Sequence, residues 1–186
     1  MGADKSQLTF NGESLLTLSI RKLRSVAMRV IVVVDNSNRL SNVEVETCID
    51  QFPDTGPLGG IVTGLQVLGD GSHLVVACDM PDLNTDILQL LIDNSSETWD
   101  AVVPTRNGHP EPLCALYRSS SLPALKAFLS NGGRSVQKSL TTFRTLYLDE
   151  TAWGCYDLNA NSFTNLNYPE ELVDYINRDQ IGRTNY

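Results

Sequence analysis

Hydrophobic and polar positions alternate along this chain in two distinct periods. Apolar residues recur at helical spacing within 15–23, 61–68 and 85–93, and each of these segments carries polar residues at the remaining positions or at its ends. Short continuous apolar runs, typical of buried strands, lie between them at 30–34 and 74–78. The alternation predicts βα units built around a mainly parallel sheet.

Further elements follow the same alternation toward the end of the chain. Strands are expected at 43–49, 101–103, 113–117, 144–149 and 163–167, and helices at 122–129, at 134–143 and from 169 onward. Pro104 is expected to end the strand before it, and residues 153–162 are expected to be irregular. No repeat or low-complexity linker divides the chain, so we expect one α/β domain over residues 1–186.

The apolar run at 74–78 is followed directly by Asp79, Met80 and Pro81. If this run is a central strand covered by helices on both faces, Asp79 lies where ligands bind in open α/β sheets, outside the carboxyl ends of the strands. A carboxylate at that place can hold a divalent cation for a phosphate substrate. The alternative is that Asp79 only caps the proline turn, and the stretch alone favours neither interpretation.

Three further features have both a functional and a structural interpretation. Gly56 and Gly60 lie in a glycine-rich loop that opens a helix, where backbone N–H groups can cradle a phosphate, although such glycines more often only relieve backbone strain. Arg134 follows two glycines at a helix start, where it can bind a phosphate or remain on the surface. His109 precedes a proline in a polar loop, and we favour a loop-shaping role for it.

Composition restricts the classes of partner. The 186 residues are 41% hydrophobic and 19% charged, with a formal charge of −8 that argues against nucleic acid as a partner. An anionic ligand would need local lysine and arginine side chains and a bound cation to overcome this charge. No apolar run approaches the roughly 20 residues of a membrane helix, and a signal peptide pattern is missing, so we expect a cytoplasmic protein. The four cysteines form no C-x-x-C pair, which predicts reduced thiols.

Six segments, taken together, resemble the molybdenum cofactor guanylyltransferases, which belong to the Rossmann-like nucleotidyltransferases. Two of them are Gly-Pro-Leu-Gly-Gly at 56–60 and Cys-Asp-Met-Pro at 78–81, and the others lie at 1–5, 111–117, 133–136 and 165–172. Each motif is modest alone, but their order along nearly the whole chain makes the combination specific. The resemblance implies a Rossmann-like three-layer α/β/α nucleotidyltransferase fold with a mainly parallel sheet.

The resemblance also implies a reaction, the transfer of GMP from GTP to the terminal phosphate of molybdopterin with Mg²⁺ as cofactor and pyrophosphate as product. A phosphate nucleophile is already anionic, so no general base is required. Molybdenum cofactor insertion proteins or apo-molybdoenzymes are implied as transient partners. By position, the implied residues are Lys5 at the triphosphate, Gly2, Gly56 and Gly60 at the nucleotide, Asp50 near the nucleoside, Asp79 on Mg²⁺, and Arg134, Asn165 and Asn167 at the reacting phosphates or the pterin.

Two departures from the family pattern limit this expectation. The family's motif begins with an apolar strand and a Leu-Ala-Gly-Gly loop that recognises the base, and this sequence begins after both. We therefore expect weak GTP binding and unpaired backbone in the middle of the sheet, and we interpret Met1 as a start assigned too far downstream. Tyr168 stands where the family usually has a helix-capping threonine. A related enzyme, such as a molybdopterin cytidylyltransferase or a sugar-phosphate nucleotidyltransferase, and a truncated non-catalytic homologue remain alternatives.

Overall fold

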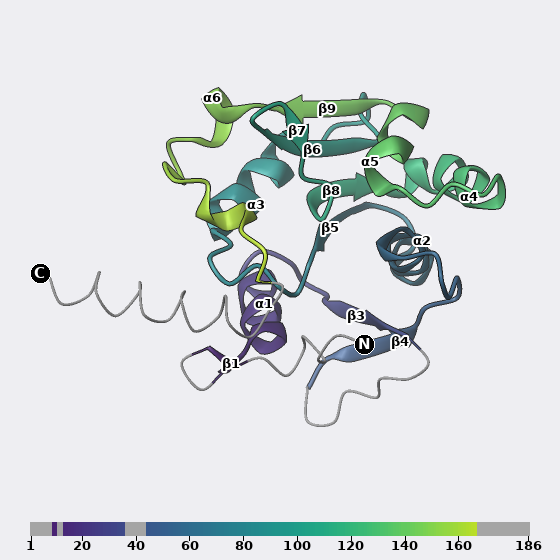
Figure 1. Cartoon of the computed structure of the whole chain (residues 1–186), viewed down its shortest axis with the longest axis horizontal. Coiled ribbons are helices and arrows are strands. Elements are labelled where there is room, and N and C mark those ends of the chain that lie inside the picture. The colour runs from purple at the N-terminus through teal and green to yellow at the C-terminus, as the bar shows by residue number, and fades with distance from the viewer. Residues whose placement is uncertain (1–8, 11–12, 36–43, 167–186) are drawn as a thin grey trace, which may run out of the picture.

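The computed structural model describes residues 9–10, 13–35 and 44–166 (Figure 1). The strands are β1 (Thr9–Phe10), β2 (Glu13–Ser14), β3 (Ile31–Val34), β4 (Glu46–Ile49), β5 (Ser72–Val76), β6 (Ala101–Arg106), β7 (His109–Pro110), β8 (Cys114–Arg118) and β9 (Thr145–Leu148). The α-helices are α1 (Leu15–Arg24), α2 (Pro57–Leu68), α3 (Thr85–Asp93), α4 (Leu122–Ser130), α5 (Val136–Ser139) and α6 (Glu150–Trp153). Three 3₁₀ helices lie at Ser119–Ser121 (η2), Leu140–Thr142 (η3) and Asn161–Phe163 (η4).

The described strands form a five-stranded sheet, a separate parallel pair and a short antiparallel pair of β1 with β2. In the larger sheet, β6 pairs in parallel with β9 and antiparallel with β8 and β7, and β8 pairs antiparallel with β5. The strands β5, β6 and β9 therefore run in one direction and β8 runs in the other. The parallel pair joins β3 to β4, with Ile31 opposite Glu46. The connection from β4 through α2 to β5 is a helical crossover, which is typical of parallel strands.

Helices cover both faces of the sheet. Figure 1 shows α1, α3 and α6 on one side and α2, α4 and α5 on the other. Alternate residues of β6 belong to two separate cores, with Ala101 and Val103 packed beside α2, α4 and α5, and Val102 packed beside α3 and α6. This alternation is the two-residue period of a strand, and it produces the three layers. Within the described ranges, no helix combines the length and apolar character needed to cross a membrane.

The strands β3 and β5 are less buried than their apolar sequences predict. All four residues of β3 and the last four of β5 are only partly buried, whereas the first four of β6 are fully buried. Among the described strands, β5 is an edge of its sheet and β3 has β4 as its single partner. An edge strand has one side without a neighbouring strand, so its side chains keep solvent contact. The prediction that 74–78 is a strand buried from both sides is therefore wrong for this part of the chain.

Local side chains explain where several helices begin. The side-chain oxygens of Ser14 and Asn84 accept hydrogen bonds from backbone N–H groups in the first turns of α1 and α3. Helix α2 begins instead after Gly56, whose φ of +66° is costly for other residues, and Pro57 occupies its first turn. Helix α2 therefore starts four residues before position 61, where apolar spacing alone predicts it.

Other predicted elements differ from the observed ones. Strand β6 continues through Pro104 to Arg106, and the carbonyl of Pro104 accepts a hydrogen bond from Glu111 N at 2.9 Å. The helix expected at 134–143 is divided into α5 and η3, and 163–166 forms no strand. Residues 153–162 are expected to be irregular, but Trp153 is the last residue of α6. Its ring packs edge-on against Phe163, with ring centroids 4.9 Å apart. The helix expected from 169 onward lies outside the described residues.

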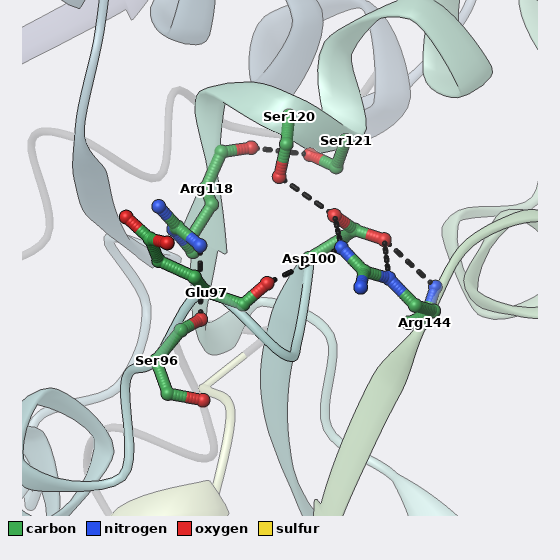
Figure 2. A network of polar contacts seen from close by, with 7 residues as sticks. All are labelled: Ser96, Glu97, Asp100, Arg118, Ser120, Ser121 and Arg144. Atoms are coloured by element: carbon green, nitrogen blue, oxygen red, sulfur yellow. Dashed lines mark hydrogen bonds and ion pairs between the residues drawn. The ribbon is translucent and has the colours of Figure 1, made fainter.

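A charged network fixes the start of β6 (Figure 2). The carboxylate of Asp100, directly before β6, accepts hydrogen bonds from the hydroxyl of Ser120 at 2.7 Å and from the backbone N–H of Arg144 at 3.1 Å. The Arg144 guanidinium adds two more, at 3.1 and 3.0 Å. These bonds from Arg144 are the main reason why the pKa of Asp100 lies well below its usual range. The network joins the starts of β6 and β9 to the turn after β8.

Candidate active site

A cavity of about 1060 Å³ separates β3 from β5. Residues 29–35 line one wall and residues 70–79 line the opposite wall. Helix α1 lines it from one helical layer, with Leu16, Ser19, Ile20 and Leu23, and α2 lines it from the other, with Pro57, Gly60, Ile61, Gly64, Leu65 and Leu68. The cavity therefore lies in the plane of the sheet, bounded by two strands and two helices.

The middle of the cavity is apolar and shaped by strand edges. A residue in a packed sheet occupies about 160 Å³, from a rise of about 3.3 Å, a strand spacing of about 4.8 Å and a layer spacing of about 10 Å. The cavity thus has room for about six residues in extended conformation. The walls are Ile31–Val34 on one side and the apolar part of β5 on the other.

Polar groups gather at one end of this cavity, where β3 and β5 end. Asp35 directly follows β3, Asp79 follows β5 after a short connection, and both line the cavity together with Asn165. The backbone N–H of Leu166 donates to the carbonyl of Asp79 at 2.9 Å. This bond ties the segment that carries Asn165 to the loop that carries Asp79. The structure therefore brings together Asp79 and Asn165, two of the predicted site residues.

The start of α2 reaches the same cavity. Gly60 lies in its first turns and lines the cavity, and a Cβ added there would lie 3.9 Å from Val33 Cγ1. Pro57 also lines the cavity, whereas Gly56 acts as the residue that allows the helix to begin. The N-terminal turn of a helix presents free N–H groups and a partial positive charge, which suit a phosphate.

Asp50 holds the turn between β4 and α2. Its carboxylate accepts hydrogen bonds from Phe52 N and from the Thr63 hydroxyl, both at 2.9 Å. The turn is tight, because a Cβ added at Gly59 would lie 2.2 Å from Thr55 Oγ1. Asp50 is not among the residues that line the cavity. The structure therefore gives it a role in shaping the loop before α2.

Arg134 and His109 lie away from the cavity lining. The Arg134 guanidinium donates to the carbonyls of Leu129 at 3.2 Å and Gly133 at 2.8 Å, in the connection between α4 and α5. His109 is exposed on the hairpin between β6 and β7. The turn of that hairpin uses Asn107 and Gly108, both with positive φ. The structure does not bring Arg134 to Asp79, and it places His109 in β7, outside the cavity lining.

Three predicted site residues, Gly2, Lys5 and Asn167, lie outside the described residues. Three side chains near Asp79 are not among the site residues predicted from the sequence: Asp35, Lys22 and Ser162. Asp35 carried a signal, because it follows the strongest apolar run as Asp79 follows its own run. Lys22 and Ser162 carried none, because a charged residue on an amphipathic helix and a serine in a polar stretch are both common.

Oxygen donors dominate the polar end of the cavity. In the ranges that the structure describes, no group of three or more His, Cys, Asp or Glu side chains is arranged to hold a metal ion. Asp35, Asp79 and Asn165 nevertheless supply carboxylate and amide oxygens to one cavity. Mg²⁺ is commonly held by one or two carboxylates, with water and substrate phosphates as its other ligands. The donor set fits a Mg²⁺ ion that binds together with a nucleotide.

The four cysteines, at positions 48, 78, 114 and 155, are all free thiols. Burial raises the pKa of the Cys114 thiol to about 12, and it also raises the pKa of Cys48. A thiol with a raised pKa is a poor nucleophile at neutral pH. At neutral pH these two side chains are therefore held mainly as neutral thiols.

Comparison with known proteins gives a consistent result. The family described as the MobA-like NTP transferase domain matches residues 1–144. A probable molybdenum cofactor guanylyltransferase of Chloroflexus aggregans is 32% identical, over 99% of this chain and 90% of its own length. A molybdenum cofactor guanylyltransferase of Vibrio parahaemolyticus is also 32% identical, over 94% of this chain and 87% of its own length. These matches confirm the resemblance found in the sequence motifs.

Solved structures share the fold. Molybdopterin-guanine dinucleotide biosynthesis protein A from Archaeoglobus fulgidus matches with a TM-score of 0.83 at 24% identity, over 96% of this chain and 92% of its own. The 2-C-methyl-D-erythritol 4-phosphate cytidylyltransferase from Thermus thermophilus matches with a TM-score of 0.71 at 12% identity, over 96% of each chain. The expected Rossmann-like α/β nucleotidyltransferase fold is confirmed by these neighbours.

Proposed function

The chain belongs to the MobA-like NTP transferase family, and from this premise we propose that it transfers GMP from GTP to the terminal phosphate of molybdopterin. Membership makes the protein a nucleotidyltransferase of molybdenum cofactor biosynthesis. The choice of GTP and molybdopterin is our proposal, and the names of its relatives support it. We also propose transient contact with molybdenum cofactor insertion proteins or apo-molybdoenzymes, which would receive the product.

The proposed step joins two anions. A terminal phosphate oxygen of molybdopterin attacks the α-phosphorus of GTP, a new P–O bond forms, the bond between the α-phosphorus and the bridging oxygen breaks, and pyrophosphate leaves. The nucleophile is anionic at neutral pH, so no side chain has to remove a proton. The protein has to align the two phosphates and reduce their repulsion. This requirement is severe in a chain with a formal charge of −8.

One observation carries the assignment of the site: Asp79, Asn165 and residues from the first turns of α2 line one cavity. We assign Asp79, with Asp35, to a Mg²⁺ ion that would neutralise charge on the reacting phosphates. We assign Gly60 to close approach of the nucleotide, because its missing side chain leaves the start of α2 open. Asn165 faces the same cavity and is assigned to hydrogen bonds with phosphate or pterin.

Residues outside the described ranges complete the proposal. We assign Lys5 to the triphosphate, Gly2 to nucleotide backbone contacts and Asn167 to the same substrate as Asn165, by their positions in the matching motifs. We do not assign Arg134 to the reacting phosphates, because its guanidinium is bonded within its own loop. The guanidinium would have to leave these carbonyls in order to act.

Replacement of Asp79 tests the proposal. The change Asp79→Asn keeps the shape of the side chain and removes the charge, so formation of the guanine dinucleotide cofactor from GTP, molybdopterin and Mg²⁺ should be lost while the melting temperature is unchanged. The matched control is Asp70→Asn, because Asp70 lines the opposite end of the same cavity. Wild-type turnover by Asp79→Asn would refute the assignment. Turnover of CTP in place of GTP by the unmodified chain would instead favour a cytidylyltransferase.

A further inference from the structure

The loop from Asp79 to Asn84 connects β5 to α3 and presents Asp79 to the cavity. It contains no regular helix or strand, yet its apolar residues Met80 and Leu83 are each 1% exposed. A loop of this kind has to be held by contacts from other elements, because its own backbone supplies few hydrogen bonds. Two side chains that the proposed reaction does not use supply such contacts.

Lys22 holds the loop from helix α1. Its Nζ donates a hydrogen bond to the carbonyl of Pro81 at 2.6 Å, across 59 positions of sequence. The side chain is partly buried, and this burial is the main reason why the pKa of Lys22 lies below its ordinary value. Asp82, in the same loop, favours the charged form. The ammonium group of Lys22 therefore binds a backbone carbonyl two residues after Asp79.

Ser162 holds the same loop from η4. Its side chain is fully buried, and its Oγ accepts a hydrogen bond from Asn84 N at 3.0 Å and donates one to the carbonyl of Asp82 at 3.3 Å. Further along the same segment, Leu166 N donates to the carbonyl of Asp79. The hydroxyl therefore connects the loop of Asp79 to the segment that carries Asn165.

We propose that Lys22 and Ser162 are positioning residues that hold the loop 79–84 so that Asp79 stays at the metal-binding place. This inference rests on the proposed function, which assigns the metal to Asp79. The three hydrogen bonds from these two side chains fall on Pro81, Asp82 and Asn84, so they restrain the middle and the far end of the loop. Leu166 restrains its beginning. Loss of either side chain leaves loop groups without their partners and lets the loop open locally.

The first measurement is amide hydrogen exchange in the full chain, read by mass spectrometry over residues 77–88. Lys22→Met and Ser162→Ala should each exchange about tenfold faster in this segment than the unmodified chain, because local opening becomes easier. Two controls remove the same kinds of group from α5 in the other helical layer: Lys138→Met, at an exposed position, and Ser139→Ala, whose fully buried hydroxyl donates to Val136 O at 2.7 Å. Neither control should change exchange at 77–88.

The second measurement is the Mg²⁺ concentration that gives half-maximal nucleotidyl transfer. Outer residues that orient metal ligands typically alter metal affinity by about tenfold or more, so both variants should need about tenfold more Mg²⁺. Activity at saturating Mg²⁺ should largely return. Lys22→Arg and Ser162→Thr keep a donor at the same place and should restore most of the Mg²⁺ affinity.

The two measurements separate the possible failures. Unchanged exchange at 77–88 in both variants would overturn the proposal, whether or not the chain transfers nucleotides. Faster exchange with unchanged Mg²⁺ dependence would also overturn it, because the residues would then serve stability alone. Faster exchange together with a higher Mg²⁺ concentration for half-maximal transfer supports it. An unmodified chain without any transfer activity would refute the proposed function, and the exchange result would still decide whether Lys22 and Ser162 hold the loop.

Discussion

The two halves of the sheet have similar apolar sequences and different burial. In the half built on β6, β8 and β9, which we call the closed half, Ala101, Val102 and Val103 are at most 1% exposed. In the half built on β3 and β5, which we call the open half, the run Ile31–Val34 is wholly apolar and remains partly exposed. The difference lies in the neighbours. β6 has a strand on each side, whereas β3 and β5 face each other across a cavity.

This contrast separates two contributions that are often treated as one. Apolar composition specifies that a segment forms a strand, and strand pairing on both sides decides whether the side chains lose contact with water. Helices α1 and α2 cover the faces of the open half, yet they do not bury β3 completely. The following predictions test how this difference in burial affects ligand binding and stability.

The largest effect should come from filling the cavity. An apolar strand of about six residues, followed by a Leu-Ala-Gly-Gly loop and added ahead of Met1, matches the available volume. Its loop would add backbone N–H groups for the triphosphate, so we expect GTP affinity to rise about a hundredfold, from about three hydrogen bonds of about 1 kcal/mol each.

Calorimetric titration with GTP and Mg²⁺ measures this affinity, and thermal unfolding measures the accompanying gain in melting temperature. A Gly/Ser extension of equal length is the control and should change neither quantity. Equal GTP affinity in the unmodified chain and in the chain with the apolar extension would show that the open half needs no further strand.

Matched leucine truncations should reveal the difference in packing. Leu88 on α3 is 0% exposed in the core of the closed half, and Leu88→Ala should lower the free energy of unfolding by about 3 kcal/mol. Leu74 on β5 is only partly buried and lines the cavity, so Leu74→Ala should cost about 1 kcal/mol or less. Urea denaturation of both variants checks the ratio. Equal losses would mean that the two halves are packed to the same degree.

The ion pairs of the two halves should differ in the same direction. Asp100→Asn removes a carboxylate whose side chain is 11% exposed, and we expect a loss of about 2 kcal/mol at neutral pH, as for a charge-assisted hydrogen bond. In the open half, Arg29 and Glu46 form a pair at 2.7 Å with side chains 49% and 47% exposed. Glu46→Gln should therefore have a smaller effect than Asp100→Asn.

The effect of Asp100 depends on pH in a defined direction. Because the pKa of its carboxyl is lowered in the folded state, its contribution is fully present above the unfolded value of about 3.9 and is lost as the pH falls toward the folded value. The difference in stability between the unmodified chain and Asp100→Asn should therefore be constant from about pH 7 to pH 5 and should shrink below about pH 4. A difference that grows in acid would contradict this account.

The smallest effects should come from the glycines of α2. Gly60→Ala and Gly64→Ala each add one methyl group toward β3, where the nearest atoms lie 3.9 and 3.5 Å away on Val33. Both changes should raise the free energy of unfolding by about 0.5–1 kcal/mol, because alanine favours the helix. If Gly60 gives the nucleotide room at the helix start, Gly60→Ala alone should weaken GTP binding. Equal GTP affinity in both variants would remove that role.

Much of the fold follows from hydrophobic periodicity. The predicted helices at 15–23 and 85–93 coincide with α1 and α3 almost to the residue, because each has a clear apolar face and a capping residue in front. The exposure of β3 and β5 did not follow, because burial depends on strands that are distant in sequence. Strand β6 passes through Pro104 for the same reason, since its pairing with β9 continues there.

The residues of the candidate site also differ in whether the sequence alone could predict them. Asp79 could be predicted because its position after an apolar run has a general meaning in α/β sheets. Gly60 could be proposed from the glycine-rich loop that opens a helix, whereas Asn165 required the family motifs, and the structure places both on the cavity. Lys22 and Ser162 could not be predicted, because their contacts join residues 59 and 78 positions apart. Side chains that act through such contacts leave no local pattern in a single sequence.

The contacts that hold the loop 79–84 have a consequence for synthesis on the ribosome. One of these contacts comes from α1, near the beginning of the chain, and the others come from residues 162 and 166. A growing chain can pair β5, β6 and β8 before those last residues emerge, because the strands precede them in sequence. The site is therefore assembled after the strands, by the contacts that span the longest stretch of chain. A product released before residue 162 would keep much of the core and the contact from Lys22, and would lack the contacts of Ser162 and Leu166 that also hold the loop.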